Sequence, residues 1–161
     1  MKKKEIVLGL PAHRKMVCGF TLIEIMVVIT IIGILVTLTL LGLQGSRESA
    51  RDARRRSDIE SIRAGLELYK ADCKKYPIGN ILSQDSLKGD GSITSCAAGN
   101  TYISNMPEDP TGGTTRVYKY SSTDGITYEL CASLERGGTA VVCAGSTSCG
   151  SENCTYSATN P

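Results

Sequence analysis

The chain has 161 residues, of which 41% are hydrophobic and 21% are charged, and its formal net charge is +2. This composition excludes an intrinsically disordered chain, and the charge gives no strong field that would attract nucleic acid. Tryptophan is absent, while phenylalanine and histidine each occur once, so aromatic platforms for bases are poorly supplied. If the first residues are removed, no imidazole remains for a Ser-His or Cys-His catalytic pair or for a histidine-bound metal.

The N-terminal region separates into a basic leader and an apolar run. Residues 1–19 have a formal charge of +4, whereas the rest of the chain has a formal charge of −2. Residues 20–43 read FTLIEIMVVITIIGILVTLTLLGL, with Glu24 as the only charged side chain. As a helix these residues would extend about 36 Å, long enough to cross the hydrocarbon core of a bilayer. The sequence therefore predicts a transmembrane helix at 20–43.

Three kinds of membrane segment have to be compared. A secretory signal peptide has a shorter apolar region followed by a small-x-small cleavage site, which this run lacks. A lipoprotein anchor needs a cysteine just after the apolar run, whereas Cys18 precedes it. A plain single-span anchor fits the length but leaves Glu24 unexplained, because a carboxylate costs about 2.5–3.5 kcal/mol at the centre of a spanning helix and somewhat less near its end. Glu24 is therefore expected to have a functional partner.

Residues 19–24, which read GFTLIE, stand directly before the apolar run. This motif resembles the cleavage site of the type IV pilin-like family, which comprises prepilins and the pseudopilins of type II secretion. In that family a membrane peptidase cuts after the glycine on the cytoplasmic side and methylates the new amino group, usually of phenylalanine. The resemblance implies cleavage after Gly19 and N-methylation of Phe20, and it matches the family's glutamate to Glu24.

The position of Glu24 agrees with that resemblance on physical grounds. After cleavage, the Phe20 ammonium is a charge in or near lipid without a fixed partner. In a helical filament, Glu24 of one subunit can lie beside the Phe20 amine of its neighbour, and a mispaired register would leave both charges exposed to lipid. The alternative is that Glu24 only extends toward the headgroups. The motif favours the role in assembly.

The orientation of the predicted transmembrane helix is inferred from the cysteines. Basic residues flank the helix on both sides, so their distribution does not decide the orientation. Six cysteines lie beyond the span: Cys73, Cys96, Cys131, Cys143, Cys149 and Cys154. An even number in a small domain favours disulfides in an oxidising compartment, which places the C-terminal part outside the cytoplasm. No C-x-x-C spacing supports a metal site, so we expect none.

Residues 44–76 are expected to continue the helix as an extracytoplasmic amphipathic stalk. Its apolar stripe comprises Ile59, Ile62, Leu66, Tyr69, Cys73 and Tyr76, at the spacing of one helix face. The next proline is Pro77, so one helix from Phe20 to about Tyr76 is allowed. Gly33, Gly42 and Gly45 are candidate points for bending or close helix packing.

A basic run, residues 54–56, lies within this stalk. Three arginines could contact DNA phosphates. A place at the membrane boundary, or pairing with acids of adjacent stalks, is favoured instead, so nucleic acid is not expected as a partner.

Residues 77–161 are expected to form a globular head. Glycine and proline make residues 77–114 mainly loop. Alternating apolar residues predict three antiparallel strands within 115–143, at 117–120, 126–134 and 139–143. Residues 144–161 form a tail held by disulfides. The expected fold class is α+β, with the long N-terminal helix packed on a small three-stranded antiparallel sheet.

Six cysteines allow 15 disulfide pairings, which the expected fold narrows. Cys96 is the first cysteine in the loop that folds back over Cys73. Cys131 and Cys143 flank the turn at residues 137–138, where strands would bring them opposite each other. The expected set is therefore Cys73–Cys96, Cys131–Cys143 and Cys149–Cys154. The main rival links Cys131 to Cys149 or Cys154.

Residues 106–110, MPEDP, and 75–77, KYP, look like segments of the major pseudopilins of type II secretion. That group has a C-terminal calcium-binding loop rich in aspartate, whereas the tail here has one acid, Glu152, and two cysteines. Calcium needs six to eight oxygen ligands, so no cofactor or metal is expected, and a disulfide could hold the tail instead. Glu108 and Asp109 are expected to be solvated turn residues. No nucleophile, base or cofactor loop suggests an enzyme.

The resemblance implies a structural subunit of a type IV pilus-like or type II secretion pseudopilus filament, which polymerises through its N-terminal helix. The implied partners are other copies of the chain, the prepilin peptidase, minor pilins, a cytoplasmic ATPase, the inner-membrane assembly platform and membrane lipid. The chain would cross the inner membrane once, with the head outside the cytoplasm, and then enter a periplasmic or extracellular filament. The alternative is a minor tip pilin that acts as an adhesin or a DNA-uptake module.

Overall fold

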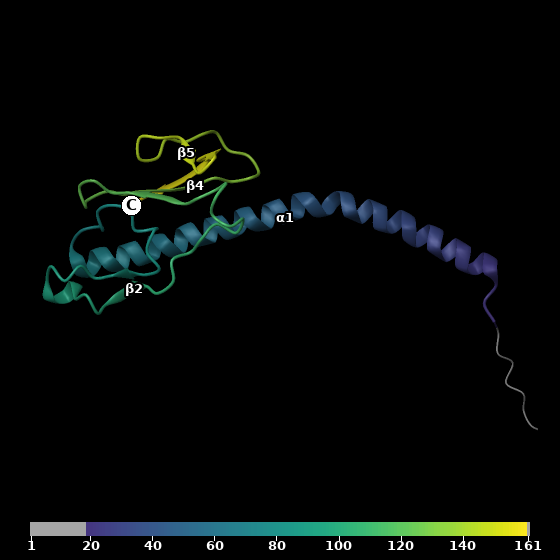
Figure 1. Ribbon diagram of the computed structural model, residues 1–161, viewed down its shortest axis with the longest axis horizontal. Coiled ribbons are helices and arrows are strands. Elements are labelled where there is room, and N and C mark those ends of the chain that lie inside the picture. Colours follow the sequence, from purple (N-terminus) through teal and green to yellow (C-terminus); the bar gives the residue numbers. More distant parts are fainter. Residues whose placement is uncertain (1–18, 161) are drawn as a thin grey trace, which may run out of the picture. The chain divides into compact units, whose positions relative to one another are not determined.

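The computed structural model describes residues 19–160, so His13 and Cys18 lie outside the described residues. The chain divides into two compact units, residues 1–42 and 43–161. The described part of the first unit contains the start of helix α1 (Leu22–Cys73), and the rest of α1 belongs to the second unit. We describe each unit by itself (Figure 1).

In the first unit, α1 begins with a side-chain cap. The Glu24 backbone N–H donates to Thr21 Oγ1 at 3.4 Å, and the sequence Thr-x-x-Glu is that of a capping box. The side chains described in residues 20–42 are all exposed. The hydroxyls of Thr30, Thr37 and Thr39 donate to carbonyls of the preceding turn at 2.8, 2.8 and 2.6 Å. These three hydroxyls are thus satisfied within the helix, which presents an apolar surface suited to lipid or to other helices.

In the second unit, the predicted stripe is the buried face of α1. Ile59, Ile62 and Leu66 are fully buried, and Tyr69 and Cys73 are 3% exposed. The helix ends three residues before the predicted end because Lys74 adopts the left-handed conformation (φ 62°), a common helix C-terminus. Tyr76 nevertheless stays in the core.

The stripe packs on a three-stranded antiparallel sheet, which confirms the predicted fold class. The sheet consists of β3 (Lys119–Ser121), β4 (Glu129–Ala132) and β7 (Tyr156–Thr159), in the order β3-β4-β7. Across it Tyr120 pairs with Leu130, which pairs with Ala158. All three are buried, so this row faces the core.

The third strand is not the predicted one. Residues 139–143 form no strand, and the sheet is completed by β7, which lies in the predicted tail. After β4 the chain leaves the sheet, because the backbone N–H groups of Glu135 and Arg136 donate to the Asp52 carboxylate on α1, each at 2.9 Å. These bonds to the helix replace the expected hairpin with β4.

The predicted loop 77–114 also contains short regular elements. These are β1 (Leu87–Lys88), the 3-10 helix η1 (Thr94–Cys96) and β2 (Thr101–Ile103). β1 and β2 pair antiparallel with a register irregularity. In Figure 1, β2 and β4 lie on different sides of the C-terminal half of α1. A last hairpin joins β5 (Ser148–Cys149) and β6 (Glu152–Asn153).

Gly65 is required by a close approach of β2 to α1. A Cβ at this position would lie 2.3 Å from Ile103 Cγ1. Gly65→Ala should therefore lower stability by about 1–3 kcal/mol, although alanine normally stabilises a helix by about 1 kcal/mol relative to glycine. Thermal unfolding of the full chain in detergent tests this. Gly45→Ala is the control, since its Cβ would meet only Arg136 Nη1 at 3.8 Å. A Gly65→Ala protein that melts no lower than the control contradicts the packing argument.

Candidate assembly site

The predicted processing and assembly residues lie at the start of α1. Phe20 is 78% exposed, and a Cβ at Gly19 would have nothing within 4 Å. Glu24 is exposed in the first helical turn, where the partial positive charge of the helix N-terminus favours a carboxylate. Within residues 19–160, the Glu24 carboxylate has no ion pair or hydrogen bond.

The second unit has a buried charge network centred on Arg55, whose side chain is 0% exposed. Its guanidinium donates two hydrogen bonds to Asp109, from Nε at 2.7 Å and from Nη2 at 3.0 Å. Nη1 donates to Asp52 and to Glu135, each at 2.8 Å. Arg51 forms a further two-bonded contact with Glu135. Because Asp109 and Glu135 are on separate loops, the network ties both loops to α1.

The pKa values in this network reflect the ion pairing. Burial lowers the pKa of Arg55, but hydrogen bonds to Asp109, Glu135 and Asp52 outweigh it and raise that pKa overall. Hydrogen bonds from Arg51, opposed by burial, lower the pKa of Glu135 to about 2. Burial raises the pKa of Asp109, yet its bonds with Arg55 and Thr111 lower it overall. All three groups are therefore charged at neutral pH, and the buried charges compensate one another.

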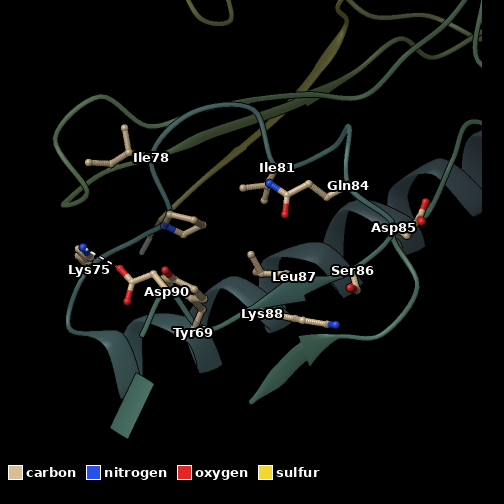
Figure 2. A pocket seen from close by; sticks show the side chains of 12 residues that line it. Tyr69, Lys75, Ile78, Ile81, Gln84, Asp85, Ser86, Leu87, Lys88 and Asp90 are labelled. Carbon is tan, nitrogen blue, oxygen red and sulfur yellow. Dashed lines mark ion pairs between the residues drawn. The ribbon is translucent and has the colours of Figure 1, made fainter. Parts of the chain in front are cut away.

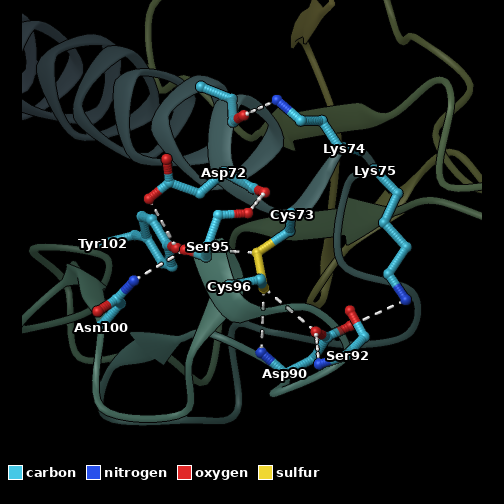
Figure 3. Close-up of a disulfide and its surroundings, with 11 residues drawn as sticks. Asp72, Cys73, Lys74, Lys75, Asp90, Ser92, Ser95, Cys96, Asn100 and Tyr102 are labelled. Carbon is cyan, nitrogen blue, oxygen red and sulfur yellow. Dashed lines mark hydrogen bonds and ion pairs between the residues drawn. A yellow bond between two sulfur atoms is a disulfide. The ribbon is translucent and has the colours of Figure 1, made fainter.

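The six predicted half-cystines are joined as Cys73–Cys96, Cys131–Cys143 and Cys149–Cys154, which is the expected set. Figure 3 shows Cys73–Cys96 at the C-terminal end of α1, where Ser95 Oγ donates to the Asp72 carbonyl at 2.7 Å. Cys73, Asp90 and Cys96 place ligand atoms within 4.8 Å of one another. Because the two sulfurs are bonded to each other, no thiolate is available to a metal there.

A hollow of about 610 Å³ lies between the end of α1 and β1. Figure 2 shows its lining, with Lys75 and Asp90 at one end; their side chains form an ion pair at 2.8 Å. The rest of the lining includes the apolar side chains of Ile78, Ile81 and Leu87.

Two family models match the chain over the regions just described. The prokaryotic N-terminal methylation motif matches residues 14–40, and protein G of the type II secretion system matches residues 43–140. The chain belongs to the type II secretion system protein G family. The predicted resemblance to the pilin-like family, and to the major pseudopilin within it, is confirmed.

Curated relatives agree with this membership. The type II secretion system core protein G of Escherichia coli K12 is 40% identical over 97 residues, which cover 58% of this chain and 66% of the relative. The protein of the same name from Klebsiella michiganensis is 35% identical over 100 residues, covering 59% and 68%, and that from Pseudomonas aeruginosa is 31% identical over 109 residues, covering 62% and 72%. The chain thus spans about two thirds of the length of the relatives. A comparison with solved structures gives no significant match.

Within this protein G family member, two expectations about charged residues are wrong. The basic run 54–56 was expected at the membrane boundary or paired with acids of adjacent stalks, but Arg55 is buried and pairs with acids of its own chain. The Arg54 side chain is 67% exposed. Asp109 was expected to be solvated, but its side chain is 1% exposed. Both corrections have one cause, which is the bidentate pair between the two side chains.

The sequence contains a signal for half of this network. Counted toward the N-terminus from Ile59, the spacing of the stripe reaches Arg55 and then Asp52, so both lie on the buried face of α1. Asp109 and Glu135 have no comparable signal. They come from loops whose docking on α1 depends on the tertiary fold.

Proposed function

We propose that this chain is a structural subunit of a type II secretion pseudopilus. It is cleaved after Gly19 by the prepilin peptidase, methylated on the Phe20 amine, and polymerised through the first part of α1. The observation that carries this proposal is an exposed apolar helix surface next to a Glu24 carboxylate that has no ion pair or hydrogen bond within residues 19–160. An apolar surface of this size and a carboxylate in a spanning segment both favour contacts with other molecules. Membership of the protein G family supports the same role.

The proposed function also assigns the parts of the chain. Residues 1–19 are the leader, 20–43 the transmembrane and assembly helix, 44–76 the stalk and 77–161 the head. The helix is long and apolar enough to cross a membrane. Three disulfides favour an oxidising compartment for the head. The subunit therefore crosses the inner membrane once, with its head on the far side from the cytoplasm, before it enters the filament.

Its partners follow from the same role. The filament contains other copies of the chain together with minor pilins, and the inner-membrane assembly platform and a cytoplasmic ATPase drive its growth. The chain is a substrate of the peptidase and has no catalytic role of its own.

Processing can be measured by the intact mass of the protein extracted from membranes that contain an active prepilin peptidase. The mass should equal that of the chain from Phe20 with one added methyl group. Gly19→Val should remain as the full-length precursor, because only glycine lets the peptidase approach the backbone closely. Gly33→Val, a matched change inside the helix, should be cleaved normally. Wild-type protein that retains residues 1–19 contradicts the proposal.

A further inference from the structure

The C-terminal lobe, residues 139–155, has a core made almost entirely of sulfur. Cys131 on β4 and the lobe residues Cys143, Cys149 and Cys154 are each 0% exposed and form a cluster distinct from the main core. Among residues 19–160, Val141 is the only partly buried hydrophobic packed on this cluster. The next residue, Val142, is 65% exposed. The lobe therefore has little hydrophobic burial to hold it in place.

The backbone of the lobe supplies few further contacts. Its only strands, β5 and β6, have two residues each. Two backbone hydrogen bonds connect it to the segment before β3, from Val117 N–H to Cys149 O at 3.1 Å and from Ser151 N–H to Thr115 O at 3.0 Å. At its C-terminal end, Thr155 N–H donates to the Ala132 carbonyl on β4 at 2.9 Å, and Thr155 Oγ1 accepts from Leu134 N–H at 2.8 Å. A two-stranded hairpin of this size is marginal in water. The middle of the lobe, between these attachments, therefore depends on a further constraint for its order.

The lobe lacks the oxygen ligands that a calcium ion would need to hold it in place. The only carboxylate in the lobe is Glu152, which is exposed. Glu129 on β4 lies nearby, but its Oε2 already accepts the Ala144 backbone N–H at 2.8 Å. Calcium takes six to eight oxygen ligands, including several carboxylates. The carboxylates of residues 139–155 and Glu129 therefore do not supply the calcium loop that major pseudopilins have.

We propose that Cys131–Cys143 and Cys149–Cys154 hold the lobe against the sheet in place of a calcium ion. The first disulfide anchors the lobe to β4, across 12 residues of sequence, and the second closes the β5–β6 hairpin, across five. Such cross-links remove conformational freedom from the disordered alternative. The order of the lobe consequently depends on oxidation and is independent of calcium.

Hydrogen–deuterium exchange of the full chain in detergent micelles, read by mass spectrometry, tests this proposal. In the wild-type protein, exchange of residues 139–155 should be the same within twofold in excess calcium chloride and in excess EGTA. In Cys149→Ser/Cys154→Ser, amides of residues 147–155, the β5–β6 hairpin that this disulfide closes, should exchange at least about tenfold faster. Cys73→Ser/Cys96→Ser is the matched control, with faster exchange near residues 73–96 and an unchanged lobe.

Three outcomes would overturn the proposal. The first is that the wild-type lobe exchanges several-fold more slowly in calcium than in EGTA. The second is that the lobe of Cys149→Ser/Cys154→Ser is as protected as that of the wild type. The third is that calcium restores the protection that this variant has lost. Protection of residues 59–66 shows whether a variant is folded. If the Cys149→Ser/Cys154→Ser protein is not folded, the exchange measurement is made on wild-type protein during stepwise reduction of its disulfides. The lobe must then lose protection before residues 59–66, and simultaneous loss contradicts the proposal.

Discussion

Replacing Glu24 with alanine should abolish filament formation while cleavage, membrane insertion and folding of the head remain normal. In the filament, the Phe20 ammonium would be left without its counter-charge in lipid. Removing one partner of a buried ion pair costs about 3–5 kcal/mol, so subunit association should weaken roughly a hundredfold or more. The measurement is the yield of fibres sheared from cells and counted by electron microscopy, beside the intact mass of the membrane-bound protein.

Two further variants separate charge from shape. Glu24→Gln keeps the size of the side chain but removes its charge, and it should fail in the same way. Thr30→Ala changes the same helix at a hydroxyl that bonds only within the helix, to the Val27 carbonyl at 2.8 Å, and it should form fibres normally. Glu24→Ala fibres at wild-type yield would show that charge pairing is not needed for assembly.

Replacing Arg55 with methionine should destabilise the second unit by about 3–5 kcal/mol. The change leaves Asp52, Asp109 and Glu135 in place, with Asp109 almost fully buried and without a cation. Thermal unfolding of the full chain in detergent, followed by circular dichroism, measures the effect.

The neighbouring arginine supplies the control. Arg54 contacts Asp58 only at 4.0 Å and its side chain is 67% exposed, so Arg54→Met should change stability by no more than about 0.5 kcal/mol. Arg55→Met/Asp109→Asn should recover part of the loss, because it removes the carboxylate that the single change leaves buried. Equal melting of Arg55→Met and Arg54→Met would contradict a structural role for the network.

The parts of the fold that the sequence predicted are those set by local periodicity. Ile59, Ile62 and Leu66 repeat at helical spacing, and they are the buried face of α1. The expected strand at 126–134 contains β4, although only Glu129–Ala132 pairs with neighbours. The disulfide set could be inferred because few cysteines were available and two of them flank one turn.

The parts that sequence reasoning missed depend on contacts between distant segments. Residues 139–143 are apolar enough for a strand, but the Asp52 carboxylate binds the chain just after β4 and directs it to α1. The burial of Arg55, one turn further along α1, likewise depends on distant residues. Its acidic partners Asp109 and Glu135 are 54 and 80 residues away in the sequence. Local pattern gives no information about such partners, so the charge network could not be predicted in full.

The most direct test of the proposed assembly is the structure of the filament, determined by electron cryomicroscopy at side-chain resolution. The measurement is the distance between the Phe20 amine of one subunit and the nearest Glu24 carboxylate oxygen of a neighbour. Charge pairing predicts a separation of about 2.7–2.9 Å, the length of a charge-assisted hydrogen bond. A filament in which each Phe20 amine lies more than about 6 Å from every Glu24 of its neighbours would contradict it.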